Sequence, residues 1–420
     1  MKVLWIVNSL LNKFSLNLYG KPSNGLWMDA LLEDFQGRNE YNIVVATTAK
    51  ITHAVKFVDQ NITYYALPDN VPLLYKENKK RNIRAWQTLL DEEKPDLIQV
   101  WGTEFAHGLC ALRLAKNIPS VIVIQGLLCE IAKYYRANIS EHDLHKHITF
   151  RDILRRDSML QQQKKYYKMS KKEAEMLALA GRVIGENEWC YANIAAINKD
   201  ISIYKCPMSV NRVFSKASWD ISKAEKHSII CNASGYTIKG LHILLKAVAI
   251  LKNKFEDIKL YVPGEPVIMP KTLERKIRKR GYSLYIERLI AKLNLNKNVV
   301  WLGQLSQKEL ANEYTKYRVF VMPSAIENQS SSLIEAMMVG VPAVASAVGG
   351  VPDYVMHGDN GFLYRFESYA ALAYYIEKIF TDDQLSVKLS SNAKKSMQES
   401  HTQSNITEQM TNIYKEIVCG

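Results

Sequence analysis

The stretch MPSAIENQSSSLIEA, residues 322–336, decides the fold. The apolar residues at its start predict the end of a buried strand, and residues 332–339 predict a helix. Between them lies a polar loop, in which Ser330 or Ser331 is suited to cap the helix. The stretch therefore predicts a strand, a loop and a helix start in immediate succession.

A helix start of this kind can hold an anion. The first backbone N–H groups of a helix have no partner inside it, and the helix dipole favours negative charge there. A diphosphate needs such a place. Glu335 follows about one turn into the helix, where its carboxylate can accept hydrogen bonds from ribose hydroxyls. From these residues alone, a capped surface helix with an ordinary glutamate is an equally open interpretation.

The same alternation of short apolar strands with helices extends outward in both directions and predicts parallel-sheet α/β units. Predicted strands cover residues 3–8, 42–47, 96–101, 120–124, 181–185, 228–232, 259–262, 298–302, 319–322 and 343–345. Predicted helices cover residues 26–35, 241–252, 310–317 and 332–339, and residues 137–179 are helical throughout. The rhythm is interrupted between Pro207 and Ser222, where we place a domain boundary.

The bulk composition agrees with two domains, 1–206 and 207–401. A chain of 420 residues with 47% hydrophobic and 23% charged residues is folded and too long for one ordinary core. An amphipathic helix at 402–418 is expected to pack back on the first domain. Six scattered cysteines, without a metal-ligand spacing, favour a reducing cytosol. The first strand is too short for a signal peptide, and we expect a cytoplasmic protein.

Three glycine-containing motifs follow residues 322–336 and make the interpretation of that stretch more specific. They are GVPAVAS at 340–346, VGGVPD at 348–353 and GDNGFL at 358–363. With Glu327 and Glu335 at E-x(7)-E spacing, the chain resembles the retaining glycosyltransferases of family four. The resemblance implies the GT-B fold, which is two Rossmann-like doubly wound parallel-sheet domains facing a cleft. It also implies that 1–206 is the acceptor-side domain and 207–401 the nucleotide-sugar donor domain. It implies transfer from a nucleotide-diphospho-sugar with retention of anomeric configuration and without a divalent metal or other cofactor.

The resemblance also assigns roles. Glu327 contacts the sugar hydroxyls and is catalytic, while Glu335 binds the ribose. The remaining donor-binding candidates of this region are Asn328, Gln329, Ser330, Ser331, Ser332 and Leu333.

A second motif, ASGYTIKGL at 233–241, follows the strand at 228–232. Lys239 at its end can neutralise a phosphate as a point charge and is a catalytic candidate. Gly235 is a donor-binding candidate in the same loop. In the family, an Arg a few residues earlier completes a two-cation clamp, but this chain has none there. Lys-Gly at the start of a helix is also a common solvated arrangement.

The first domain supplies weaker candidates. Gly25 resembles the family's glycine-rich first loop, where the backbone approaches the donor, and Trp27 follows it on the acceptor side. Glu104 and His107 follow the strand at 96–101; His107 is a catalytic candidate, although a lone loop histidine is more often structural. The other acceptor-side candidates after a strand end are Gln125 and Gly126.

The formal net charge of +13 favours polyanionic partners. Basic runs at 76–84, 164–172 and 271–280 are poor in aromatic residues, so we expect no nucleic acid. They are solvated faces or contacts with an anionic membrane surface. The resemblance implies lipid-linked acceptors at such a surface, and it implies sugar transfer to a glycan or lipid-linked acceptor in cell-surface polysaccharide biosynthesis. A GT-B-like sugar-nucleotide epimerase and a non-catalytic sugar-binding protein are the alternatives.

Overall fold

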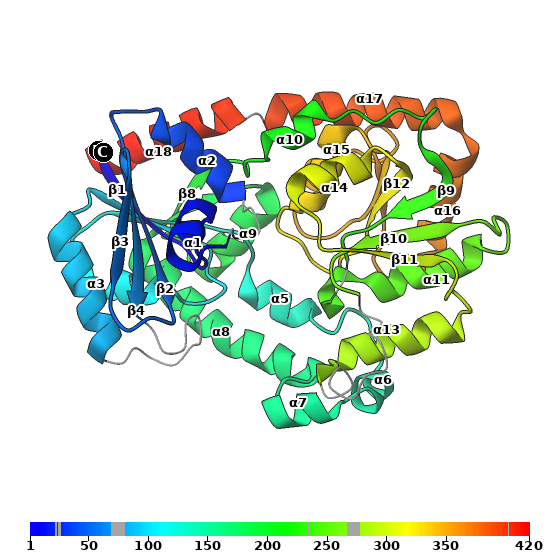
Figure 1. The fold of residues 1–420 in the computed structure, drawn as a ribbon, viewed down its shortest axis with the longest axis horizontal. Helices are drawn as coiled ribbons and strands as arrows, with labels where there is room; N and C mark the ends of the chain where they lie inside the picture. The colour runs from blue at the N-terminus through cyan, green and yellow to red at the C-terminus, as the bar shows by residue number, and fades with distance from the viewer. Residues whose placement is uncertain (22, 24–26, 69–79, 234, 267–277, 402) are drawn as a thin grey trace. The chain divides into compact units, whose positions relative to one another are not determined.

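The computed structural model describes residues 1–21, 23, 27–68, 80–233, 235–266, 278–401 and 403–420 (Figure 1). The chain divides into two compact units, each built on one sheet. Unit 1 comprises Met1–Cys129, Tyr167–Val210 and His401–Gly420, and unit 2 comprises Glu130–Tyr166 and Asn211–Ser400.

Unit 1 holds a sheet of strand order β3-β4-β2-β1-β5-β6-β7-β8, in which only the β3–β4 pair is antiparallel among the described strands. Its strands are β1 (Lys2–Ile6), β2 (Asn42–Ala49), β3 (Val55–Asp59), β4 (Ile62–Pro68), β5 (Leu97–Trp101), β6 (Ser120–Val123), β7 (Arg182–Gly185) and β8 (Ser202–Lys205). Its helices are α1 (Asn12–Tyr19), α2 (Trp27–Gln36), α3 (Lys80–Glu93), α4 (Leu109–Leu114), α9 (Glu188–Ile197) and α18 (Gln403–Cys419). Figure 1 shows α18 beside α2, and the two helices are in contact.

Unit 2 holds a parallel sheet of strand order β11-β10-β9-β12-β13-β14. Its strands are β9 (Glu225–Ile230), β10 (Lys259–Pro263), β11 (Val299–Gly303), β12 (Tyr317–Met322), β13 (Ala343–Ser346) and β14 (Phe362–Tyr364). Its helices are α6 (Glu141–Lys146), α7 (Phe150–Arg155), α10 (Arg212–Lys216), η1 (Thr237–Lys239), α11 (Leu241–Leu251), α13 (Gly281–Lys292), α14 (Gln307–Tyr314), α15 (Ser331–Val339), η2 (Val351–Asp353), α16 (Tyr369–Thr381) and α17 (Asp383–Ser400). Helices α5 (Leu128–Tyr134) and α8 (Met159–Ala180) cross between the units.

The predicted α/β class with parallel sheets is confirmed in both units. The central strands have the continuous apolar character of strands that are covered on both faces, and every residue of β12 is buried. Strands β8 and β14 were not predicted, and neither were β3 and β4. Strands β3 and β4 form an antiparallel edge hairpin, in which β3 alternates half-buried with exposed residues and therefore lacks a continuous apolar run.

The two units differ from the expected domains in the residues that each contains. The expected boundary was 206/207, and the units separate at 210/211. Residues Glu130–Tyr166, expected within the first domain, group with unit 2 because their backbone bonds to it. Thr237 Oγ1 donates to the Tyr135 carbonyl at 2.7 Å, and His242 Nε2 lies 2.7 Å from the Ala137 carbonyl. Among the described residues, no helix combines the length and apolar character that a membrane crossing requires.

Candidate functional site

Three loops of unit 2 meet at the carboxyl ends of the neighbouring strands β9, β12 and β13. The Ala325 N–H, after β12, donates to the Ile238 carbonyl, after β9, at 2.7 Å. The Gly350 N–H, after β13, donates to the Glu327 carbonyl at 3.2 Å. Ligands of open α/β sheets bind at this edge. The loops are thus joined by backbone bonds at the place where the topology favours a ligand.

Two glycines allow the loops to come this close. Gly240 has φ +69°, and a Cβ on it would lie 1.7 Å from the Pro323 carbonyl oxygen. Gly349 has φ +52°, and a Cβ there would lie 1.7 Å from the Glu327 carbonyl oxygen. Any other residue at either position would push the Glu327 loop away.

Lys239 and Glu327, predicted from separate motifs, are in direct contact. The Lys239 Nζ donates to Glu327 Oε1 at 2.6 Å, and the Ser324 Oγ donates to the same oxygen at 2.6 Å. The Lys239 side chain is 37% exposed, whereas the Glu327 side chain is 12% exposed. The carboxylate is therefore held in one orientation, and the ammonium group remains partly open to a ligand.

The start of α15 has the predicted position. Ser330 is the N-cap residue, but its side chain makes no capping bond and its Oγ lies 3.4 Å from the Ser332 Oγ. The Leu333 and Ile334 N–H groups already donate to the Ser330 carbonyl at 3.1 Å. The N–H groups of Ser331 and Ser332 come before these first intrahelical bonds. They are the donors that the helix start offers to an anion.

Asn328 and Gln329 lie in the same loop, directly before this helix start. Asn328 is 4% exposed and Gln329 is half-buried. The Ser330 N–H donates to the Tyr354 hydroxyl at 3.3 Å, which ties the loop to the segment after β13.

Glu335 lies on the second turn of α15, and burial raises its pKa to about 8. Its charge contributes, after burial itself, to the raised pKa of Tyr314. The Tyr314 hydroxyl accepts from Asn232 Nδ2 at 2.8 Å and donates to the Ser332 carbonyl at 3.5 Å. Glu335 is thus a largely neutral carboxyl at pH 7, near polar groups at the end of β9.

Gly235 has φ +93° and borders a cavity of about 860 Å³ within unit 2. The lining is rich in cations and comes from the ends of β9, β10 and β11 and from α7 and the segment before α13. The lining residues are Arg151, Leu154, Arg155, Gly235, Tyr236, Gly264, Glu265, Pro266, Arg278, Lys279, Arg280, Ser283 and Gln304.

Polar groups also gather after strands β5, β6 and β7 of unit 1. A Cβ on Gly102 would lie 2.1 Å from Glu104 Oε2 and 3.1 Å from Gln125 Oε1, so these two predicted side chains lie close together. Burial raises the pKa of Glu104 to about 7, and the Glu173 charge adds to the shift. Gln125 and Gly126 are half-buried.

Two carboxyl groups of this cluster were not among the predicted site residues. Glu186 follows β7, and burial and the Glu104 charge raise its pKa well above the ordinary value. Glu173, on α8, is 1% exposed and accepts from Thr103 Oγ1 at 2.6 Å and from the Leu128 N–H at 3.0 Å. A position directly after a buried strand is the signal that marks Glu186. Glu173 carries no such signal, because its helix is rich in charged residues.

His107, the other catalytic candidate of unit 1, has a setting that favours a structural role. It is 9% exposed, its Nε2 lies 3.1 Å from the Trp101 carbonyl, and burial lowers its pKa to about 4. The imidazole is therefore neutral at physiological pH. Gly25 lies outside the described residues; Trp27 begins α2.

A known protein family matches part of unit 2, the unit that holds the three-loop site. Residues 214–396, within unit 2, match the family model described as Glycosyl transferases group 1. The capsular polysaccharide biosynthesis glycosyltransferase CapM of Staphylococcus aureus is 28% identical over 176 residues, which are 42% of this chain and 42% of CapM. The chain spans about two fifths of the length of the first curated relatives it matches.

Two solved structures resemble the chain over its whole length. Sucrose-phosphate synthase from Thermosynechococcus elongatus has a TM-score of 0.73 at 19% identity and covers 100% of both chains. The fold is GT-B. Anabaena HepE in complex with UDP-glucose has a TM-score of 0.66 at 18% identity, over 99% of this chain and 100% of HepE. The predicted GT-B fold class is thereby confirmed; at these identities the likeness concerns the fold alone.

The GT-B fold explains why the candidate residues come from distant parts of the sequence. Each Rossmann-like unit presents loops at the carboxyl ends of its own strands. In unit 2 these loops carry Lys239, Glu327 and the start of α15. In unit 1 they carry Glu104, Gln125 and Glu186.

Proposed function

We propose that the chain is a retaining glycosyltransferase that moves a hexose from a nucleotide-diphospho-sugar to a glycan or lipid-linked acceptor. The contact between Lys239 and Glu327 carries the proposal. It brings a cation suited to the donor phosphate and a carboxylate suited to the donor sugar within 2.6 Å, beside a helix start with open N–H groups.

In the proposed reaction, the bond between the anomeric carbon and the diphosphate oxygen breaks, and the acceptor hydroxyl oxygen bonds to that carbon on the same face of the sugar. The proton of the hydroxyl passes to the leaving diphosphate. The leaving diphosphate gains negative charge. Lys239 and the N–H groups of Ser331 and Ser332 stabilise that charge, which is an electrostatic task. Glu327 accepts hydrogen bonds from the sugar hydroxyls, and Glu335 accepts from the ribose. Because Lys239 and the helix start supply positive potential, the proposal needs no divalent metal.

The comparisons support the class of reaction. The family model that matches unit 2 is one of glycosyl transferases, CapM is named for capsular polysaccharide biosynthesis, and HepE was solved with UDP-glucose. We therefore propose a role in cell-surface polysaccharide biosynthesis, at the cytoplasmic face of a membrane. Glu104 and Gln125 are the proposed contacts to the acceptor.

The test uses purified protein and a panel of nucleotide-sugars with glycan and lipid-linked acceptors. A donor-dependent product is expected, and NMR of its anomeric proton should report the configuration of the donor. Glu327→Ala and Glu335→Ala should each lower transfer, whereas Glu399→Ala, at an exposed position of α17, should not. Unchanged transfer in both site variants would refute the site assignment, and an added chelator should leave the rate unchanged.

A sugar-nucleotide epimerase is the second candidate, because one observation favours it. Epimerisation needs paired acid and base groups, and Glu104 and Glu186 are two carboxyls of raised pKa, of which the Glu104 charge contributes to the raised pKa of Glu186. An epimerase would convert the donor to a second sugar nucleotide without an acceptor. NMR of the donor incubated with the protein alone decides between the two: isomerisation favours the epimerase, and an unchanged sugar favours transfer.

A further inference from the structure

Helix α7 buries two of its polar side chains and exposes its three large apolar ones. Arg151 is 9% and Asp152 is 1% exposed, whereas Phe150 is 68%, Ile153 66% and Leu154 72% exposed. A surface helix of a globular protein ordinarily buries its apolar face against the core. Helix α7 instead exposes its large apolar side chains, which are therefore available to a partner outside unit 2.

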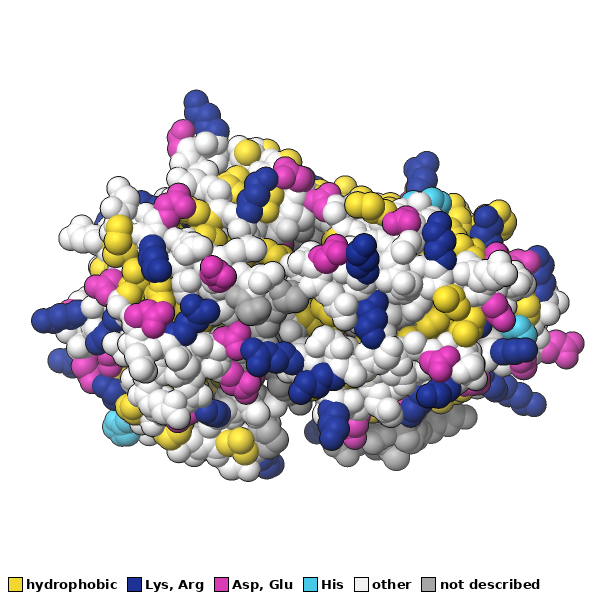
Figure 2. Space-filling model, turned by 90° about the horizontal axis from the view of Figure 1, so that it is seen from above, with side chains coloured by type: hydrophobic (Ala, Val, Ile, Leu, Met, Phe, Trp, Pro, Cys, Tyr) yellow, Lys and Arg dark blue, Asp and Glu magenta, His cyan; other side chains and the backbone are white. Residues whose placement is uncertain are grey.

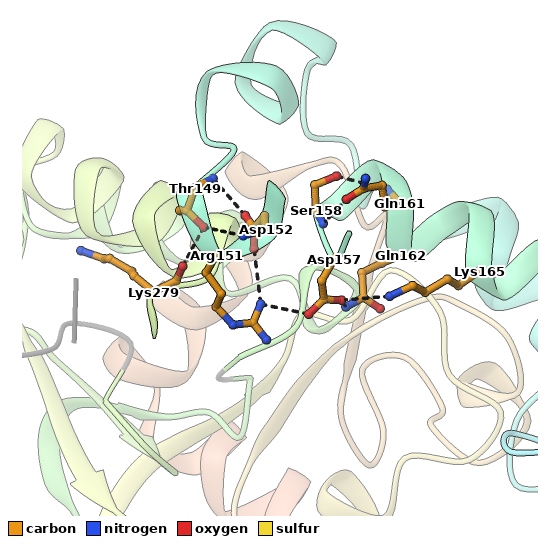
Figure 3. Close-up of polar contacts among 9 residues, drawn as sticks. All are labelled: Thr149, Arg151, Asp152, Asp157, Ser158, Gln161, Gln162, Lys165 and Lys279. Atoms are coloured by element: carbon orange, nitrogen blue, oxygen red, sulfur yellow. Dashed lines mark hydrogen bonds and ion pairs between the residues drawn. The ribbon is translucent and has the colours of Figure 1, made fainter. Parts of the chain in front are cut away.

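Polar contacts hold α7 in this orientation (Figure 3). Thr149 and Asp152 form a capping box at its start. The Thr149 Oγ1 also donates to the Lys279 carbonyl at 2.8 Å. At the other end, the Arg151 guanidinium donates to Asp157 Oδ2 at 2.9 Å, where α7 turns towards α8. The helix is therefore anchored through its polar residues.

Helix α13 lies beside α7 and leaves little room for α7 to rotate about its own axis. Gly281, at the start of α13, lies so close that a Cβ on it would be 2.5 Å from the His147 carbonyl oxygen and 2.7 Å from Asp152 Oδ2. The exposed apolar side chains are thus a fixed surface of unit 2. Phe150, Ile153 and Leu154 lie at i, i+3 and i+4 of one helix and so share one face, and exposed apolar side chains gathered on one face mark a candidate interaction site.

The patch lies among cations. Lys146, Arg155 and Arg156 are exposed on the same segment, and Leu154 and Arg155 line the basic cavity that Arg280 also borders. On the face drawn in Figure 2, by contrast, the Lys and Arg side chains are scattered and many have Asp or Glu nearby. The positive charge around α7 therefore accompanies an apolar surface, which is the combination that anionic bilayers bind.

We propose that α7 docks unit 2 on an anionic phospholipid surface. Phe150, Ile153 and Leu154 enter the boundary between headgroups and acyl chains, and Arg155 and Arg156 contact lipid phosphates. This deepens the membrane setting given under Proposed function by naming the surface that binds. It does not depend on the donor chemistry, and it can hold if the proposed transfer fails.

A second copy of the chain fits the same surface less well. In a two-fold symmetric contact the patch would face itself, so the cations beside it would also face one another. The apolar part consists of a few side chains of one short helix, whereas a stable interface takes about 800 Å² from each partner. A lipid surface carries the opposite charge and imposes no such limit.

The experiment is co-sedimentation of the full chain with vesicles of phosphatidylcholine alone or with about 30% phosphatidylglycerol. The wild type should pellet with the anionic vesicles and much less with the neutral ones. Phe150→Ser/Ile153→Ser/Leu154→Ser should lower the bound fraction at least tenfold. The matched control is Met356→Ser/Tyr374→Ser/Val387→Ser, which removes three exposed apolar side chains elsewhere in unit 2 and should bind as the wild type does.

Charge is tested separately. Arg155→Glu/Arg156→Glu should reduce binding, and Lys388→Glu/Lys395→Glu, an equal charge change at exposed positions of α17, should reduce it less. Equal losses in both pairs, or wild-type binding by the apolar variant, would overturn the proposal. So would a wild-type dimer that the apolar variant converts to monomer in sedimentation velocity, since a second copy would then be the occupant. Circular dichroism and the melting temperature, measured on every variant, should stay unchanged and report correct folding.

Discussion

The raised pKa of Glu335 predicts that donor affinity depends on pH. If only the carboxylate accepts hydrogen bonds from both ribose hydroxyls, the donor binds the ionised form. With a pKa of about 8, roughly one molecule in a hundred is ionised at pH 6. The dissociation constant should therefore fall about tenfold per pH unit between pH 6 and 8 and level off above. Glu335→Gln cannot ionise and should bind weakly and almost independently of pH.

Isothermal titration calorimetry with a nucleotide-sugar tests this, because both donor phosphates remain ionised over the whole range. Glu399→Gln should keep the wild-type profile. A wild-type affinity that does not change between pH 6 and 9 would refute the reasoning, as would the same slope in Glu335→Gln.

The Glu335 carboxyl should also make the free energy of unfolding depend on pH. Burial favours the protonated carboxyl, so its pKa rises from 4.5 in the unfolded chain to about 8 in the folded protein. The stability linked to that proton is fully present below pH 4.5 and is lost as the pH rises towards 8. At pH 7 the loss is on the order of 3 kcal/mol, at about 1.4 kcal/mol per pH unit. In urea unfolding, Glu335→Gln should be more stable than wild type at pH 8 and equally stable at pH 4.5.

Three further predictions follow from the geometry of single residues. Glu327→Gln should lower the transfer rate about a hundredfold or more while the nucleoside diphosphate still binds, and loss of nucleotide binding would contradict the assigned role. Gly240→Ala should weaken donor binding because its Cβ meets the Pro323 carbonyl, whereas Gly358→Ala, also at positive φ but with nothing within 4 Å, should only lower stability by about 1 kcal/mol. His107→Asn should reduce the melting temperature and leave the pH profile of transfer unchanged; a large fall in kcat without a change in melting would favour the catalytic role.

The elements that could be predicted are those whose signal is local. The strand, loop and helix start around Ser330 depend on neighbouring residues, and the structure has them where the sequence places them. The contact of Lys239 with Glu327 joins residues 88 positions apart, so the sequence could name both side chains without showing that they touch. Gly349 is a second example. It lets the Glu327 carbonyl approach closely, and the sequence does not show that these two loops meet.

The burial of charged residues was the other feature that the sequence could not predict. Glu173 lies in a helix of lysines and glutamates, and its burial depends on Thr103 and the Leu128 N–H, which come from other segments. The same holds for α7. Its FRDILR sequence suits an ordinary amphipathic helix, and only the partners of Arg151 and Asp152 determine which face is inside.

The position of α18 in unit 1 has a consequence for synthesis on the ribosome. The Trp5 indole N–H donates to the Tyr414 hydroxyl, and Ile406, Met410 and Ile413 belong to the same core as the first strand. At about 5–20 residues per second, roughly 20 to 80 seconds separate the two halves of that core. Unit 2 is interrupted less and can fold while unit 1 still waits for its last helix. Until then, the nascent first sheet exposes the apolar surface that α18 later covers, and it is the part of the chain that chaperones would need to protect.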